Sequence, residues 1–199
     1  MKPQTIIFFG MQGSGKGTQV ALLQKYLKEC EPDRGVVHYE TGKGFRSIAE
    51  MNGYTAQRVR EELSQGNMLP TSLATMLWSQ AFMDEFTGKE LVLIDGFPRS
   101  QVQADILHEA LQFYKLLPAQ VIFLDIKDTT AIDRLTKRGR HDDTPDIISN
   151  RIAWYREHVQ PITDWYKAHS EYEVHHIDAE MSEGDIHKEI LKVLNLEKG

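Results

Sequence analysis

Five short runs with strand-like patterns recur along the chain, and longer segments with helical periodicity separate them. The runs cover residues 5–9, 36–39, 91–94, 120–125 and 173–177. The first, third and fourth runs are almost continuously apolar, which is typical of strands that are covered on both faces. This alternation predicts an α/β fold, in which a mostly parallel, five-stranded sheet is flanked by helices.

The segments between these runs carry helix-start signals and apolar stripes. The expected stripes are Val20, Leu23 and Leu27; Leu73, Met76 and Leu77; Val102, Ile106, Ala110 and Phe113; and Ile148, Ile152, Tyr155, Val159 and Ile162. The expected helix starts are Thr55, Pro70, Ser100, Thr144-Pro145 and Ser182. Ser182 to Asp185 resembles a capping box, and Pro161 predicts a kink in the longest helix.

The balance of basic and acidic side chains indicates which classes of binding partner to expect. The 199 residues include 23 basic and 29 acidic side chains, which gives a formal charge of −6. Proteins that bind nucleic acid or membrane surfaces generally rely on an excess of Lys and Arg, so neither partner is expected. Any site for an anionic ligand must therefore gather positive charge locally.

The cysteine content and the lengths of the apolar runs indicate which metal sites and which cellular location to expect. Cys30 is the only cysteine, so we expect neither an internal disulfide nor a cysteine-based zinc site. The apolar run at residues 5–9 is too short for a signal peptide, and no run reaches the roughly 20 apolar residues that span a bilayer. A cytoplasmic location is expected.

A glycine-rich loop lies between the first apolar run and the first helical segment. It reads Gly-Met-Gln-Gly-Ser-Gly-Lys-Gly-Thr over residues 10–18. Such a loop lets main-chain N–H groups and a helix N-terminus converge on phosphate, while Lys16 can reach the β- and γ-phosphates. Thr18 is the nearest hydroxyl for the magnesium–phosphate end, because Gly17 stands where a standard Walker A sequence has Ser or Thr. The loop predicts a P-loop NTPase fold.

Gly-Lys-Gly-Thr in this context is the form found in nucleoside monophosphate kinases. From about residue 4 to residue 194, the chain resembles the short, zinc-free type of adenylate kinase. The resemblance implies one P-loop kinase domain over residues 1–199. It has a core (1–40, 73–138 and 144–199), an inserted NMP-binding flap (41–72) and a short lid (139–143). It also implies an enzyme that transfers a phosphoryl group between ATP and AMP with Mg²⁺ and without zinc. Nothing in the sequence suggests an obligate dimer interface, so a monomer is expected.

By this resemblance, the donor nucleotide has a definite set of partners. The residues expected to bind ATP are Gly13, Ser14, Gly15, Lys16, Gly17, Thr18, Arg134 and Arg138. Asp95 ends a buried apolar run, which is the usual way in which a P-loop fold holds magnesium through water. Asp95 and Thr18 are therefore the expected metal residues.

A second signature, Asp-Gly-Phe-Pro-Arg over residues 95–99, points to the acceptor nucleotide. By resemblance, Arg99 binds the phosphate of AMP and Gln103 reads its adenine ring. The residues expected to bind AMP are Thr41, Gly42, Arg46, Gly66, Met68, Leu69, Gly96, Arg99, Gln103, Arg140 and Arg151. Lys43 departs from the family, which has Asp at this place. Its charge can either attract phosphate or disturb the loop that positions AMP.

An arginine cluster supplies the local positive charge that the acidic chain requires. Arg134 and Arg138 lie four residues apart on one helical face, Arg140 begins the turn after Gly139, and Arg151 comes from the next helix. The resemblance implies that Arg134 stacks on the ATP adenine, and that Asp142 and Asp143 orient the phosphate-binding arginines. The expected catalytic residues are Lys16, Arg99, Arg138, Arg140 and Arg151.

Two alternatives stay open. One is a UMP/CMP kinase or another nucleoside monophosphate kinase, against which Gln103 and Thr41 speak. The other is a catalytically weak nucleotide-binding regulatory module, for which Lys43 and the short lid speak. His38, His175 and His176 lack partners at metal-ligand spacing, and Trp78, Trp154 and Trp165 are expected to pack in the core.

Overall fold

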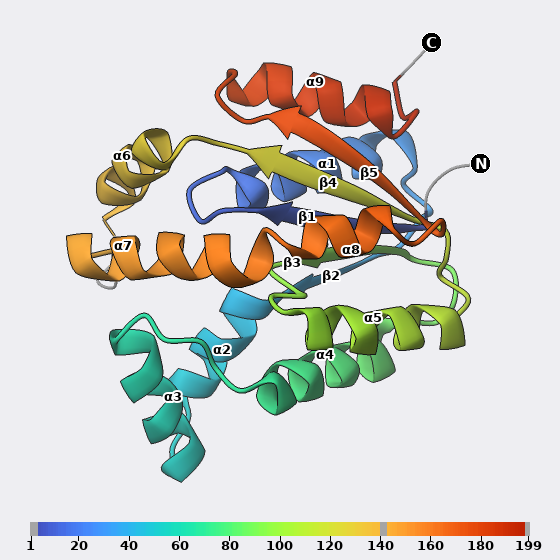
Figure 1. Ribbon diagram of the computed structural model, residues 1–199. Helices are drawn as coiled ribbons and strands as arrows, with labels where there is room; N and C mark the ends of the chain where they lie inside the picture. The colour runs from blue at the N-terminus through green and yellow to red at the C-terminus, as the bar shows by residue number, and fades with distance from the viewer. Residues whose placement is uncertain (1–3, 140–142, 198–199) are drawn as a thin grey trace.

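A five-stranded parallel sheet runs through the centre of the molecule (Figure 1). The computed structural model describes residues 4–139 and 143–197. The strands are β1 (Thr5–Gly10), β2 (Val36–Glu40), β3 (Leu91–Asp95), β4 (Ala119–Asp125) and β5 (Tyr172–Asp178), in the order β2-β3-β1-β4-β5. Each predicted strand is present and extends one residue further at one or both ends, so the predicted sheet is confirmed.

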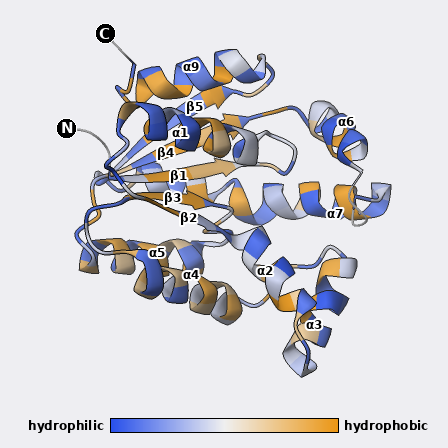
Figure 2. Ribbon diagram, turned by 180° about the vertical axis from the view of Figure 1, so that it is seen from behind, coloured by the Kyte–Doolittle hydropathy of each residue, from blue (hydrophilic) through white to orange (hydrophobic). Residues whose placement is uncertain are grey.

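Helices cover both faces of the sheet. On one face lie α1 (Lys16–Cys30) and α9 (Glu183–Val193), which share a buried cluster with Phe8 of β1. On the other face lie α4 (Thr71–Glu85), α5 (Gln101–Phe113), α7 (Pro145–Trp154) and α8 (Ile162–Lys167), which share a second cluster with Phe9. Because successive side chains of a strand point to opposite faces and both faces are covered, residues 6–9 of β1 are all apolar, and the strand appears orange in Figure 2.

The remaining helices gather at the carboxyl ends of the strands. There, α2 (Thr41–Glu50) and α3 (Tyr54–Ser64) follow β2, and α6 (Asp128–Arg138) follows β4 (Figure 1). Since all five strands are parallel, the segments that follow them meet at one edge of the sheet, where ligands of open α/β folds bind. Within residues 4–139 and 143–197, no helix combines the length and the hydrophobicity that crossing a bilayer would need.

The apolar stripe predicted for α5 is wrong. Val102 and Phe113 are 61% and 78% exposed, whereas Ala104, Leu107 and Leu111 face the core. Gln103 is also buried on that inner face, where its side-chain amide has hydrogen-bond partners. A buried, satisfied glutamine therefore replaced an apolar residue in the stripe, and the hydrophobic pattern alone pointed to the wrong face.

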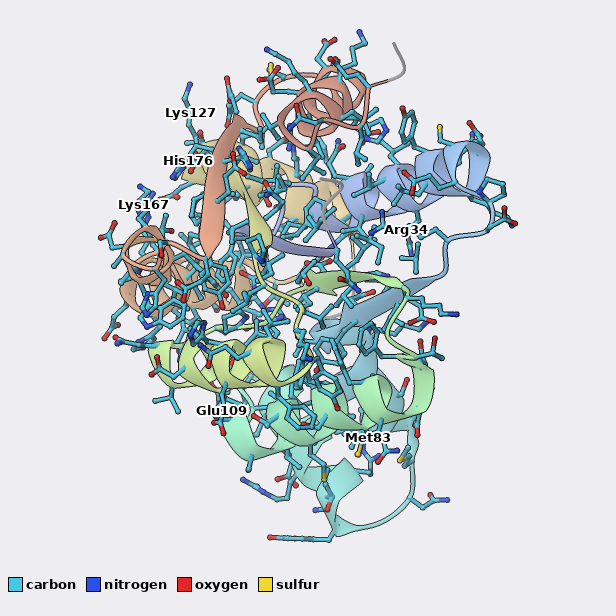
Figure 3. All side chains as sticks on the ribbon, turned by 90° about the vertical axis from the view of Figure 1, so that its right-hand side faces the viewer. Arg34, Met83, Glu109, Lys127, Lys167 and His176 are labelled. Carbon is cyan, nitrogen blue, oxygen red and sulfur yellow. The ribbon has the colours of Figure 1, made fainter. Side chains whose placement is uncertain are left out.

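The stripe predicted for α4 is confirmed in part, because Leu73 and Leu77 pack against the core, but Met76 does not. Met76 is 56% exposed, while Ala74, Trp78 and Phe82 form the buried face. Met83, one heptad after Met76, points away from the body of the molecule in Figure 3. Aromatic packing accounts for the buried face, because Trp78 stacks on Phe97 and Phe82 contacts Tyr114, with ring centroids 6.2 and 5.3 Å apart.

The stripe predicted for residues 148–162 is confirmed, since Ile148, Ile152, Tyr155, Val159 and Ile162 are all buried. The disturbance expected near Pro161 takes the form of a π-helical turn, η1 (Tyr155–Val159), between α7 and α8. The Gln160 N–H donates to the Tyr155 carbonyl at 2.9 Å, five residues back. A wider turn thus precedes the proline, which has no N–H to offer.

The predicted starts at Ser182 and Thr144 have different outcomes. The Ser182 hydroxyl accepts a hydrogen bond from the Asp185 N–H at the start of α9, as predicted. Thr144 occupies the N-cap position of α7 and Pro145 opens the helix, but the Thr144 side chain makes no capping hydrogen bond. Proline at this place suffices to begin the helix, because its backbone is already set for helical geometry.

Candidate active site

A cavity of about 1120 Å³ opens at the carboxyl edge of the sheet. Its wall contains most of the residues predicted to form the site. These are Gly13, Ser14, Gly15, Lys16, Gly17, Thr18, Gly42, Arg46, Gly66, Met68, Asp95, Gly96, Arg99, Arg134, Arg138 and Arg151. Residues that are widely separated in the sequence are therefore brought to one hollow by the parallel topology.

Four other predicted residues, Thr41, Leu69, Gln103 and Asp143, lie outside the cavity wall, and two, Arg140 and Asp142, lie outside the described residues. Thr41 is buried and its hydroxyl donates to the Gly96 carbonyl at 2.8 Å. The side-chain oxygen of Gln103 accepts from the Arg99 N–H at 2.8 Å, and its NH₂ group donates to the Thr71 hydroxyl at 3.3 Å. Thr41 and Gln103 therefore support the wall from behind.

The glycine-rich loop joins β1 directly to α1. Gly13 has φ +88°, and a β-carbon there would lie 2.9 Å from the Ala131 carbonyl, so only glycine fits without strain. The Ser14 N–H closes the turn by donating to the Met11 carbonyl at 3.1 Å. No acidic side chain occupies the first turn of α1. The N–H groups and the positive dipole end of this helix therefore remain available to an anion.

Lys16 folds back over this loop. Its ammonium donates to the Gly10 and Met11 carbonyls, at 2.6 and 3.0 Å. Burial lowers the pKa of Lys16 to about 8, although the nearby Asp95 carboxylate acts in the opposite direction. A buried ammonium whose charge is only partly compensated is well prepared to bind phosphate oxygens.

Asp95 ends β3 on the floor of the cavity. Burial raises the pKa of its carboxyl group, while Lys16 acts against that rise. The Ser14 hydroxyl is buried and has no hydrogen-bond partner among the described residues, and the Thr18 hydroxyl lies on the exposed rim. Carboxylate and hydroxyl oxygens are hard donors that suit Mg²⁺. The described residues contain no group of three or more metal-ligating side chains. The donor set therefore fits a cation that is held largely by water and by its nucleotide.

Three arginines from different parts of the chain also line the cavity: Arg46 of α2, Arg99 of the segment after β3, and Arg151 of α7. The Arg99 Nε donates to the Gly96 carbonyl at 2.8 Å, and its guanidinium also contacts the Met68 sulfur at 3.7 Å. Burial lowers the pKa of Arg99, Asp95 opposes this shift, and the like charges of Arg151 and Arg46 reinforce it. Like charges held together in this way favour an anionic ligand between them.

Asp143 links the arginines of α6 and α7. It accepts two hydrogen bonds from Arg138, at 2.8 and 2.7 Å, and one from Arg151 at 3.3 Å. Arg134 reaches in another direction, donating to the Ala179 carbonyl at 3.0 Å and contacting the Gly13 carbonyl at 3.5 Å. The arginines are thus fixed by neighbouring oxygens before any ligand binds, which is the preorganisation that electrostatic catalysis requires.

Several residues of the cavity wall were not predicted from the sequence. They are chiefly Gln19, Glu40, Trp154, Met181 and Glu183. Gln19 is buried and donates to the Glu183 carbonyl at 2.9 Å, which joins α1 to the segment after β5. That segment could have been found from the rule that ligands bind beyond the carboxyl ends of parallel strands. Trp154, expected to pack in the core, is half-buried in the wall, and Lys43 is exposed and outside the wall.

Chemically, the cavity is suited to two phosphate-bearing ligands. Its wall combines the main-chain N–H groups of the glycine-rich loop and Lys16 with the guanidinium groups of Arg46, Arg99, Arg134, Arg138 and Arg151. Fixed cations of this kind stabilise the negative charge that spreads over a migrating phosphoryl group.

Comparison with known proteins agrees with this chemistry. The family model described as adenylate kinase matches residues 8–171. An adenylate kinase from Corynebacterium urealyticum is 31% identical over 190 residues, which cover 96% of this chain and 98% of that protein. The adenylate kinase of Rhodopirellula baltica is 33% identical, covering 96% and 94%, and that of Mycobacterium sp. (strain MCS) is 34% identical, covering 82% and 86%. With its P-loop NTPase fold, the chain therefore belongs to the adenylate kinase family of phosphotransferases.

Proposed function

We propose that this enzyme catalyses the reversible transfer of the γ-phosphoryl group of ATP to AMP, with Mg²⁺, to give two molecules of ADP. The observation that carries the proposal is the convergence of Lys16, Arg99, Arg138 and Arg151 on one cavity of an otherwise acidic chain. Membership of the family supports phosphoryl transfer between nucleotides, and the residues of the cavity support this particular donor and acceptor.

On the donor side, the loop from Gly13 to Thr18 would cradle the phosphates of ATP, with Lys16 on the β- and γ-phosphates. Arg134 would contact the adenine, and Arg138 would contact the phosphates. Asp95, through water, and Thr18 would hold the magnesium ion, which supplies charge neutralisation at the β- and γ-oxygens when it is bound.

On the acceptor side, Arg46 and Arg99 would bind the phosphate of AMP. The base would rest against the segment from Gly66 to Leu69, with Thr41, Gly42, Gly96 and Gln103 shaping its pocket. An oxygen of the AMP phosphate then attacks the γ-phosphorus in line as the bond to the ADP leaving group breaks, so no covalent enzyme intermediate forms.

Arg138, Arg140 and Arg151 would stabilise the charge of the migrating group, while Asp142 and Asp143 orient them. We further propose that residues 41–72 act as a flap over AMP and residues 139–143 as a lid over ATP. Their closure would exclude water, which otherwise competes with AMP for the γ-phosphoryl group.

An acceptor panel tests the proposal. ADP formation is measured with ATP and Mg²⁺ alone, and then with AMP, UMP or CMP added. We expect rapid ADP formation with AMP and little without it. A clear preference for UMP or CMP would overturn the acceptor assignment, and equal rates with and without any monophosphate would overturn the transferase assignment.

A further inference from the structure

Glu40 lies in the acceptor side of the cavity, directly before α2. It is the last residue of β2 and stands in register with Asp95 of β3. Its Oε1 accepts a hydrogen bond from the Arg46 guanidinium at 2.8 Å, and both side chains line the cavity. One of the two arginines assigned to the acceptor phosphate is therefore already paired with a carboxylate.

The space for this ion pair is created by Gly42. A β-carbon at Gly42 would lie 3.0 Å from an Arg46 nitrogen and 3.5 Å from the Glu40 Oε1. The glycine thus lets both side chains lie against the backbone at the start of α2. The pair is consequently seated in the wall of the cavity and faces whatever enters it.

A ligand can take the place of the Glu40 carboxylate on Arg46, because this ion pair is weak. The Glu40 and Arg46 side chains are 34% and 46% exposed, and a single carboxylate oxygen makes the contact. Ion pairs as exposed as this one contribute little to stability. A phosphate dianion can receive two parallel N–H donors from one guanidinium and carries more charge than a carboxylate. It can therefore displace Glu40 from Arg46.

Displacing Glu40 from Arg46 costs electrostatic free energy. Once Arg46 turns to the phosphate, the Glu40 carboxylate is left beside a dianion and opposite Asp95. Glu40 and Asp95 end the adjacent strands β2 and β3 in register, and both line the cavity. Acceptor affinity must fall by the free energy of this repulsion together with that of the broken ion pair.

We propose that Glu40 competes with the acceptor phosphate for Arg46 and thereby lowers the affinity of the enzyme for AMP. The inference rests on the proposed function. The opposite role, in which Glu40 holds Arg46 ready for phosphate, is less consistent with the geometry. The helical backbone of α2 already fixes the position of the Arg46 main chain, so Glu40 is not needed for that. The ion pair instead draws the Arg46 guanidinium toward the Glu40 carboxylate.

The substitution Glu40→Gln tests the proposal, because it removes the charge and keeps the shape. We expect the KM for AMP to fall by about 2- to 5-fold, with the KM for ATP unchanged. Calorimetric titration with AMP in the absence of ATP should show the same gain, whereas adenosine, which lacks the phosphate, should bind both proteins equally. Glu40→Asp retains the charge and should stay near the wild type.

Glu50→Gln is the matched control, since Glu50 is exposed on α2, the helix that carries Arg46, and lies outside the cavity wall. It should leave the KM for AMP unchanged. An unchanged or raised KM for AMP in Glu40→Gln would overturn the proposal, as would an equal gain in adenosine affinity. Glu40→Ser must reproduce the Glu40→Gln result if charge is the cause. Failure of the wild type itself to form ADP from ATP and AMP would instead overturn the proposed function.

Discussion

Both carboxylate oxygens of Asp143 accept hydrogen bonds from Arg138, at 2.8 and 2.7 Å, and one of them also contacts Arg151 at 3.3 Å. The Asp143 side chain is fully buried beneath these guanidinium groups. One carboxylate thus ties the end of α6 to α7 and sets the direction in which both arginines point.

Replacing Asp143 with Asn should therefore misplace the arginines rather than remove them. We expect kcat to fall by about 10- to 100-fold, which is typical when catalytic groups move by roughly 1 Å. Steady-state kinetics with ATP and AMP measure the change. Asp133→Asn on the exposed face of α6 is the control, and a kcat equal to that of the wild type in Asp143→Asn would contradict the orienting role.

Removing the Arg99 guanidinium should have a larger effect. Arg99→Ala should lower kcat/KM for AMP by about 10³-fold or more, the scale seen when an arginine that stabilises a migrating phosphoryl group is lost. Burial already disfavours the charge of Arg99, so the thermal unfolding midpoint should stay level or rise. Arg58→Ala, on the exposed side of α3, provides the comparison. Near-normal turnover in Arg99→Ala would show that the residue has been misassigned.

The lowered pKa of Lys16 predicts that the enzyme takes up a proton when it binds a nucleotide. With a pKa of about 8 in the free enzyme, most of the Lys16 side chains are neutral at pH 9. Phosphate oxygens favour the charged form and raise this pKa, so ATP binding at pH 9 should draw most of one proton from the solution. Calorimetry in buffers of different ionisation enthalpy measures the uptake.

The same titration of Lys16→Met should show no such uptake, and at pH 6.5 the Lys16 contribution should vanish because the ammonium is already charged. Equal proton uptake by Lys16→Met and the wild type at pH 9 would assign the proton to another group.

The charge of Lys43 should matter little to acceptor binding. Its side chain is exposed on α2 and lies outside the cavity wall, where solvent and salt screen it. Lys43→Asp, which restores the residue of the family pattern, should change the KM for AMP by less than about 2-fold. A change of fivefold or more would mean that Lys43 reaches the acceptor during turnover.

The positions of β1, β3 and β4 could be predicted from the sequence because strands that are buried on both faces are almost continuously apolar. The edge strands β2 and β5 carry polar residues and were predicted as parts of the α/β alternation. Helix faces were harder to predict. On α5, the buried stripe includes Gln103, whose amide is satisfied by the Arg99 backbone and by Thr71, and no hydrophobic pattern can reveal such a partner. On α4, Trp78 and Phe82 face inward, where their rings pack on Phe97 and Tyr114 of other segments.

The candidate site was predictable where motifs are contiguous, as in the loop before Lys16. The residues that were missed are those that only topology brings to the cavity. Glu40 became part of the wall because β2 lies in register with β3, and Met181 because β5 ends at the same edge as β1. Neither residue belongs to a sequence motif that indicates ligand binding.

Following the γ-phosphoryl group itself tests the central claim most directly. The wild-type enzyme is incubated with AMP, Mg²⁺ and ATP that is labelled in its γ-phosphate, and the products are separated. We predict that the label appears in ADP and that it does so only when AMP is present. Label released as inorganic phosphate, or retained in ATP while AMP stays unchanged, would contradict the account.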